Sequence, residues 1–227
     1  MTYALLQTSM TQPPVDALQR AFRMGASLSS ADASFVADDA FGILARDLPE
    51  DDAQTVAAAL AGEEIAVEIV PESELPRLPD AQFFVSAHFS DDTLDLFDGL
   101  ERKESVPWAA LRLIAVGFDQ KEVRIEIIAG DSLIRYVSNL DRIRFHHTPE
   151  ATGRSSPEKL EHFVQSLVLK ASSAFLNRGA AELVRGNLGE RLEDVLAYPR
   201  LSAMHEEMVW LLWKARQADE KRELPGA

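Results

Sequence analysis

The residues of this chain best suited to bind an anion lie in one short stretch beyond its middle. Arg142, Arg144 and His146 occupy alternate positions there. They fall in a predicted strand, Leu140–His147, and alternate residues of a strand lie on one face. Arg135, on the strand expected before it, extends the set. Because guanidinium groups bind phosphates and carboxylates, the spacing predicts an anion-binding stripe. The alternative is a solvated face whose arginines pair with acids on neighbouring strands.

The histidines predict no metal site. His146 and His147 are adjacent, so in a strand they point to opposite faces and do not readily share an ion. The segment His205–Val209 begins like the helix of a zinc protease, but valine stands where that motif needs its second histidine. A site assembled from distant histidines is the remaining alternative, and no metal is expected.

Aspartates crowd the segment Asp91–Gly99, which carries four of them. Such density suits a hard cation such as calcium, but the spacing differs from that of an EF-hand loop. Its first two aspartates belong to Ser90-Asp91-Asp92, which two predicted strands flank, Ala81–Phe89 and Thr93–Phe97. The sequence therefore predicts a hairpin with an acidic tip.

No catalytic or cofactor-binding signature occurs in the sequence. The nucleophile elbow G-x-S-x-G and the P-loop G-x-x-x-x-G-K-[ST] are both missing. The absence of cysteine also excludes thiolate nucleophiles, thiolate metal ligands and disulfides. No catalytic residue and no cofactor are therefore predicted. Because catalytic triads assemble in space, a hydrolase or transferase with its cleft between two domains remains an alternative.

A helix near the end of the chain carries residue types that protein interfaces favour. Met208, Trp210 and Trp213 lie on or beside the apolar face of a helix predicted from Leu201 to about Arg216. Tryptophan and methionine are enriched at the centres of interfaces, so these residues are a candidate partner interface. The alternative is ordinary core that packs the helix back on one of the domains.

The elements that must position these residues form two groups. Residues 1–78 predict the order strand, helix, strand, helix, strand, which suggests a small ferredoxin-like α/β layer. A half-Rossmann unit is the alternative, but the turn after the first strand contains no glycine. Three prolines in Val70–Asp80 mark a linker.

Residues 79–178 predict several antiparallel strands followed by one helix, Ser156–Phe175. Ser155 and Glu158 are spaced as a capping box at its start. Residues 179–227 predict a helical tail with a break around Gly186–Gly189 and a further interruption at Pro199. The expected fold class is therefore α+β: a ferredoxin-like layer, an antiparallel sheet closed by a helix, and a helical tail.

The second domain resembles the pleckstrin-homology (PH-like) superfold, including its bacterial and GRAM-like versions. The resemblance is carried by the strand count, by the Pro107-Trp108-x-x-Leu111-x-x-Ile114 entry into a central strand and by the closing helix. The whole chain is also similar to bacterial two-domain proteins with no associated activity, through the stretches Val106–Gly117 and Leu176–Ala180. PH-like domains bind lipid headgroups, bind peptides or act as scaffolds, so the resemblance implies binding without choosing a ligand.

Charge narrows the classes of partner. The net charge is −14, and residues 1–80 hold 14 acidic residues against four arginines and no lysine. Contact with a nucleic-acid backbone or an anionic membrane would cost Coulomb energy, so neither partner is expected. The lack of cysteine and of signal-peptide features favours the cytoplasm. We expect a non-catalytic binding or scaffold protein that contacts a protein partner; a small anion or phosphate sensor is an alternative, and no oligomeric state is specified.

Overall fold

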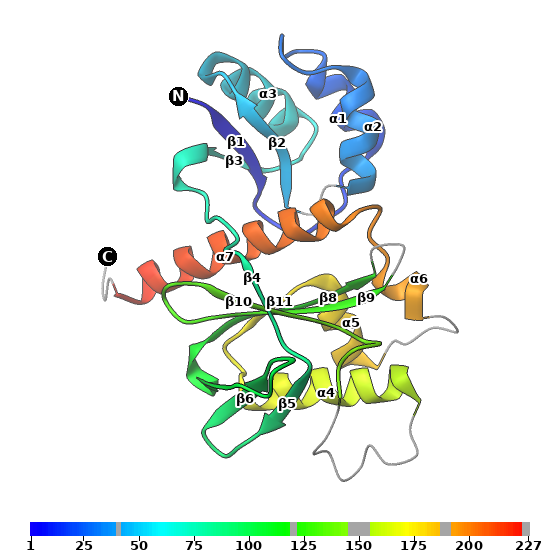
Figure 1. Cartoon of the computed structure of the whole chain (residues 1–227). Coiled ribbons are helices and arrows are strands. Elements are labelled where there is room, and N and C mark those ends of the chain that lie inside the picture. Colours follow the sequence, from blue (N-terminus) through cyan, green and yellow to red (C-terminus); the bar gives the residue numbers. More distant parts are fainter. Residues whose placement is uncertain (40–41, 119–121, 145–154, 187–191, 224–227) are drawn as a thin grey trace. The chain divides into compact units, whose positions relative to one another are not determined.

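A computed structural model gives the fold of the chain and describes residues 1–39, 42–118, 122–144, 155–186 and 192–223. The chain divides into two compact units (Figure 1). Unit 1 comprises Met1–Arg77 together with Pro199–Ala227, and unit 2 comprises Leu78–Tyr198. The segment expected as a separate tail thus divides between them at residue 198. The combination of helices and mainly antiparallel sheets confirms the α+β class.

A three-stranded antiparallel sheet forms the centre of unit 1. Its middle strand is β1 (Tyr3–Gln7), in which Ala4, Leu5 and Leu6 are all fully buried. Because consecutive strand residues point to opposite faces, both faces of β1 are covered. The predicted order of elements is present, with one additional helix, α2, after the first helix. The remaining elements are α1 (Val15–Phe22), α2 (Ser30–Asp39), β2 (Ile43–Leu48), α3 (Glu50–Gly62), β3 (Val67–Pro71) and η1 (Glu72–Glu74).

Helices lie on both sides of this sheet. α1, α2 and α3 share one apolar cluster with Leu5, Leu44 and Leu48 of the strands. On the other side lies α7 (Leu201–Glu223), which contacts β2 (Figure 1). The start of α3 has local causes in the sequence, because Pro49 precedes the helix and three acids in its first turn interact favourably with the positive end of the helix dipole.

Unit 2 contains two sheets, a five-stranded one in the order β11-β8-β9-β10-β4 and a three-stranded one in the order β5-β6-β7. The segment Ala81–Phe89, expected as one strand, divides at Phe84 and Val85 between the two sheets. Its first part pairs in parallel with β10, and its second part forms the expected hairpin with β6. The strands before the closing helix are β4 (Ala81–Phe83), β5 (Ser86–Phe89), β6 (Thr93–Phe97), β7 (Lys103–Pro107), β8 (Leu111–Phe118), β9 (Val123–Ala129) and β10 (Ile134–Asn139), with η2 (Trp108–Ala110) before β8.

The closing helix α4 (Ser156–Lys170) begins with the capping box that the sequence predicts between Ser155 and Glu158. Its apolar face is buried at Leu160, Phe163, Val164 and Leu167. The expected end at Phe175 was wrong. The helix ends at Lys170. Phe175 and Leu176 form the short edge strand β11, which pairs in parallel with β8.

One apolar core lies between the two sheets and α4. Phe89 of the smaller sheet stacks on Trp108 at 5.4 Å between ring centroids and meets Phe163 of α4 edge-on at 5.5 Å. Two more helices, α5 (Arg178–Arg185) and α6 (Leu192–Leu196), complete unit 2. Gly186 ends α5 in the left-handed conformation, with φ of 71°, which glycine adopts without strain. It lies at the start of the break expected in this part of the chain.

Candidate functional site

The predicted anion-binding stripe does not form a strand face. Arg142 lies in a turn, and the backbone N–H groups of Arg142 and Ile143 both donate to the carbonyl of Asn139. Tight turning after β10 breaks the alternation on which the stripe depended. Arg144 follows as an isolated bridge beside Ser86 of β5. The fourth member of the set, His146, lies outside the described residues.

Arg135 belongs to an ion-pair cluster inside unit 2. Its Nε forms an ion pair with Oε2 of Glu126 at 3.0 Å, but the N–H bond does not point at this oxygen closely enough for a hydrogen bond. A further guanidinium N–H donates to the carbonyl of Pro79 at 3.1 Å. Arg124 donates to the other oxygen of Glu126 at 2.7 Å, and the Glu126 side chain is fully buried. The arrangement matches the alternative in which arginines pair with acids of a neighbouring strand.

Met208, Trp210 and Trp213 are all buried. The indole N–H of Trp210 donates to the carbonyl of Gln7 at 2.7 Å, and its ring leaves no room for a side chain at Gly42. The indole N–H of Trp213 lies 3.3 Å from Oε2 of Glu68. The two tryptophans therefore pack against unit 1 itself, as in the alternative of ordinary core, and Met208 is fully buried.

The acidic hairpin is present, but one of its aspartates is not at the tip. Asp91 and Asp92 form the exposed turn between β5 and β6, whereas Asp95 is buried on β6. Burial by itself raises the pKa of Asp95, but hydrogen bonds outweigh it and hold that pKa well below its usual range. The donors are Lys103, at 2.7 Å, together with the hydroxyls of Ser105, Ser90 and Thr93.

His88 and Ser90 lie beside Asp95 without forming a catalytic relay. Nδ1 of His88 is 3.5 Å from the Ser90 hydroxyl and 3.8 Å from Oδ2 of Asp95. In a triad the serine and the acid approach opposite nitrogens of the histidine, so that a proton can pass through the ring. Here both approach the same nitrogen, and the Ser90 hydroxyl donates directly to Asp95 at 3.0 Å. This cluster therefore stabilises the sheet and lacks the geometry of a nucleophile.

Two hollows flank the turn that joins β6 to β7. The first, here called the β4 pocket, has a volume of about 410 Å³ and is lined by Phe83, Asp98, Arg102, Glu104 and Tyr136 among others. The Tyr136 hydroxyl donates to Glu104 at 2.5 Å. Burial, together with the neighbouring Glu104 carboxylate, raises the pKa of Tyr136, so the hydroxyl stays protonated and keeps this bond.

The second hollow, the β5 pocket, has a volume of about 310 Å³. Arg144, His88, Phe97, Asp98 and Glu101 are among the residues that line it. Arg144 is the only described member of the predicted anion-binding set that lines either pocket. Both hollows fall at or near the lower end of the volume range typical of ligand sites.

The segment Asp98–Arg102, here called the tip loop, separates the two pockets and is held by its own hydrogen bonds. The Asp98 carboxylate accepts from the backbone N–H groups of Leu100 at 2.8 Å and Arg102 at 3.0 Å. It also accepts from Nε of Arg102 at 2.6 Å. Backbone bonds between Asp98 and Arg102 and between Asp98 and Glu101 close the turn. These bonds hold Glu101 at a positive φ of 60°, which a non-glycine residue seldom adopts.

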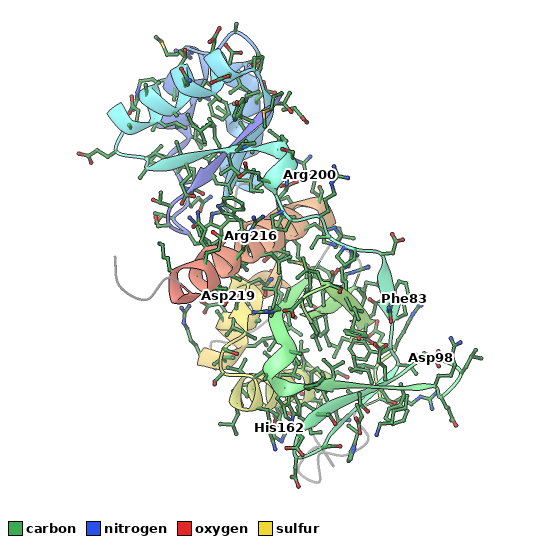
Figure 2. All side chains as sticks on the ribbon, turned by 90° about the vertical axis from the view of Figure 1, so that its left-hand side faces the viewer. Phe83, Asp98, His162, Arg200, Arg216 and Asp219 are labelled. Atoms are coloured by element: carbon green, nitrogen blue, oxygen red, sulfur yellow. The ribbon has the colours of Figure 1, made fainter. Side chains whose placement is uncertain are left out.

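Two large apolar side chains stand exposed at this end of unit 2. Phe83 of β4 is 59% exposed and lines the β4 pocket, and Leu100 of the tip loop is 75% exposed. Figure 2 shows Phe83 and Asp98 at the same end of the unit. Neither residue is among the site residues predicted from the sequence. A signal existed for Phe83, because adjacent residues of a strand face opposite ways and Phe83 and Phe84 cannot both point into one core.

Comparison of the chain with protein-family models, with characterised proteins and with solved structures found no match. The likeness to PH-like domains therefore stays a prediction. Within the described residues, no helix has the length and apolar character needed to cross a membrane. In the same part of the chain, no group of three or more histidine, aspartate or glutamate side chains is arranged to hold a metal ion.

Proposed function

We propose that this chain is a non-catalytic binding or scaffold protein that holds an extended segment of a protein partner at the tip of unit 2. The observation that carries the proposal is the exposed ring of Phe83 on an edge strand beside the β4 pocket. Exposed aromatic side chains next to a hollow are typical of the anchor points of protein interfaces.

The position of β4 supports an extended partner. β4 ends the order of the five-stranded sheet, so among the described residues no strand of that sheet pairs with its outer side. Such edges accept a further strand from another chain, with backbone hydrogen bonds supplying affinity and side-chain pockets supplying specificity. Phe83 and the β4 pocket are placed to supply that specificity.

The tip loop supports the proposal through its rigidity. A partner that binds a preorganised surface avoids part of the entropic cost of ordering it. The three bonds to Asp98 hold the loop in one shape while Leu100 remains exposed. Leu100, which lies between Asp98 and Arg102 in the chain, thus offers an apolar contact in a fixed position next to residues of the pocket that Phe83 also lines.

Site-specific photo-crosslinking tests the proposal. A photoreactive phenylalanine analogue is introduced in place of Phe83, of Leu100 or of Leu169, and the full chain is irradiated in cells of its own source. Leu169 is the matched control, because it is an 83% exposed leucine on α4 of the same unit. We expect one discrete protein adduct shared by positions 83 and 100 and absent at position 169.

A second variant separates binding from stability. In a chain with the analogue at position 100, Phe83→Ser should remove the adduct while leaving the melting temperature unchanged within a few degrees, because the replaced ring is exposed. Adducts of equal pattern at all three positions would show nonspecific contact. The absence of any adduct at positions 83 and 100 would contradict the proposal.

A further inference from the structure

Arg144 differs from the other arginine and lysine side chains that line the two pockets. In the β4 pocket, Arg102 pairs with Asp98 at 2.6 Å and Lys103 pairs with Asp95 at 2.7 Å. Arg144 is exposed and lines the β5 pocket, and in the described part of the chain its guanidinium group has no hydrogen bond or ion pair. Its charge is therefore available to a ligand.

The backbone of Arg144 is fixed even though its side chain is not. The Arg144 N–H donates to the carbonyl of Val85 at 2.7 Å, and the residue bridges to Ser86 of β5. The guanidinium group consequently projects from an anchored point beside a hollow of about 310 Å³. Anchoring reduces the entropy that a ligand must remove on binding.

The other residues of the β5 pocket restrict the charge of a ligand. Asp98 is already neutralised by Arg102 and by two backbone donors, so it contributes little repulsion. Glu101 also lines the pocket, and among the described residues no ion pair of its carboxylate is found. Its repulsion opposes an incoming anion and is weaker for a single negative charge than for a phosphate dianion. Phe97 supplies an apolar wall.

We propose that the β5 pocket binds a carboxylate group of a peptide segment, with Arg144 as its charged hydrogen-bond donor. Guanidinium and carboxylate groups match in geometry and form paired, charge-assisted bonds. The proposal deepens the function proposed above, because it names the chemistry that the second pocket recognises in a protein partner.

Small carboxylates test the site without a known partner. The full chain, labelled with ¹⁵N, is titrated with N-acetyl-leucine, with the α-amide of N-acetyl-aspartic acid, which keeps only the side-chain carboxylate, and with N-acetyl-leucinamide. Inorganic phosphate at matched ionic strength is a fourth arm. We expect saturable shifts of the amides around the β5 pocket, at Ser86, His88 and Gly99, with the carboxylates only.

Two arginine variants make the test specific. Arg144→Gln should weaken carboxylate binding by about tenfold or more, as expected for the loss of a hydrogen bond between charged groups. Arg142→Gln is the matched control, because Arg142 is also exposed but does not line the pocket, and it should bind as the unchanged chain does. The ¹⁵N spectrum itself reports whether each variant is folded.

The arms separate the sources of the carboxylate. Binding of N-acetyl-leucine alone would assign the pocket to the C-terminus of a partner chain, and binding of the aspartic acid derivative alone would assign it to an acidic side chain. Equal shifts with N-acetyl-leucinamide, tighter binding of phosphate, or unchanged binding by Arg144→Gln would each overturn the proposal. None of these results depends on the crosslinking at Phe83 and Leu100, so the two proposals fail separately.

Discussion

The carboxamide of Asn177 hydrogen-bonds to both backbone groups of Val116. Its Oδ1 accepts from the Val116 N–H at 2.9 Å, and its Nδ2 donates to the Val116 carbonyl at 2.9 Å. The side chain thereby takes the place of a strand neighbour where β11 ends, and it also accepts from the N–H of Ala180 and donates to the hydroxyl of Tyr198. The next residue but one, Gly179, lies so close that an added Cβ would be 2.1 Å from the Val116 carbonyl oxygen.

Asn177→Asp is expected to destabilise unit 2 by about 3 kcal/mol, because a carboxylate cannot donate to the Val116 carbonyl and its charge would be buried. Tyr198→Phe, which removes only one acceptor of the same carboxamide, should cost about 1 kcal/mol. Urea unfolding followed by circular dichroism measures both. Equal losses for the two variants would show that the Val116 bonds are not the important ones.

The buried carboxylate of Glu126 is expected to matter far more than an exposed one. Glu126→Gln leaves Arg124 and Arg135 facing each other without a counter-charge, so we expect a loss of about 3–5 kcal/mol. Asp131→Asn breaks the ion pair with Arg112, but the Asp131 side chain is 93% exposed, so its loss should be below about 1 kcal/mol. Comparable urea midpoints for the two variants would contradict this ranking.

Trp210→Phe is expected to destabilise unit 1 by about 1–3 kcal/mol, because the buried carbonyl of Gln7 loses its donor and phenylalanine does not fill the indole volume. Trp213→Phe should cost less, since Glu68 keeps the donors Lys214 and Gln217. Thermal unfolding by circular dichroism compares them. A larger loss at Trp213 would mean that the bond to Gln7 carries little of the stability.

Asp95 is expected to give the chain an acid-sensitive share of its stability. The pKa of Asp95 is lower in the folded state than in the unfolded state, where it is about 3.9. Its contribution to the free energy of unfolding is therefore fully present above about pH 3.9, and it is lost as the pH falls below that value toward the folded-state pKa. Asp95→Asn should therefore be less stable than the unchanged chain at neutral pH, and this difference should shrink below about pH 4.

The measurement for Asp95 is the free energy of unfolding of both chains as a function of pH. Lys103→Met provides an intermediate case, because it removes the charged donor at 2.7 Å while the carboxyl group and its hydroxyl donors remain. A difference between the unchanged chain and Asp95→Asn that stays constant with pH would show that Asp95 is not held ionised by its neighbours.

Local signals in the sequence predicted the helices better than the strands. The acids after Pro49 and the capping box at Ser155 act within one helical turn, so they identify helix starts without knowledge of the rest of the fold. Strand partners come from elsewhere in the chain. For that reason the division of Ala81–Phe89 between two sheets, and the pairing of Phe175 with β8, were not predictable from local pattern.

The candidate site was predicted only in part. Arg144 was selected for its guanidinium group, and the structure does place it at a pocket. Its expected companions were chosen by strand alternation, which fails because the chain turns at Asn139–Arg142. Strand alternation indicates that one of Phe83 and Phe84 is exposed but not which one, and nothing local in the sequence marks Leu100 as exposed.

Unit 1 is built from two segments that are far apart in the sequence, and this affects the order in which the units can fold during synthesis. Leu78–Tyr198 is continuous, so unit 2 can complete its core while synthesis is still in progress. The strands of unit 1 are made first, yet they wait for α7, whose Trp210 must reach Gln7 after all of unit 2 has been translated. The nascent sheet therefore spends that interval with an uncovered apolar face, where Leu6 and Ala4 would be within reach of a chaperone or of a second nascent chain.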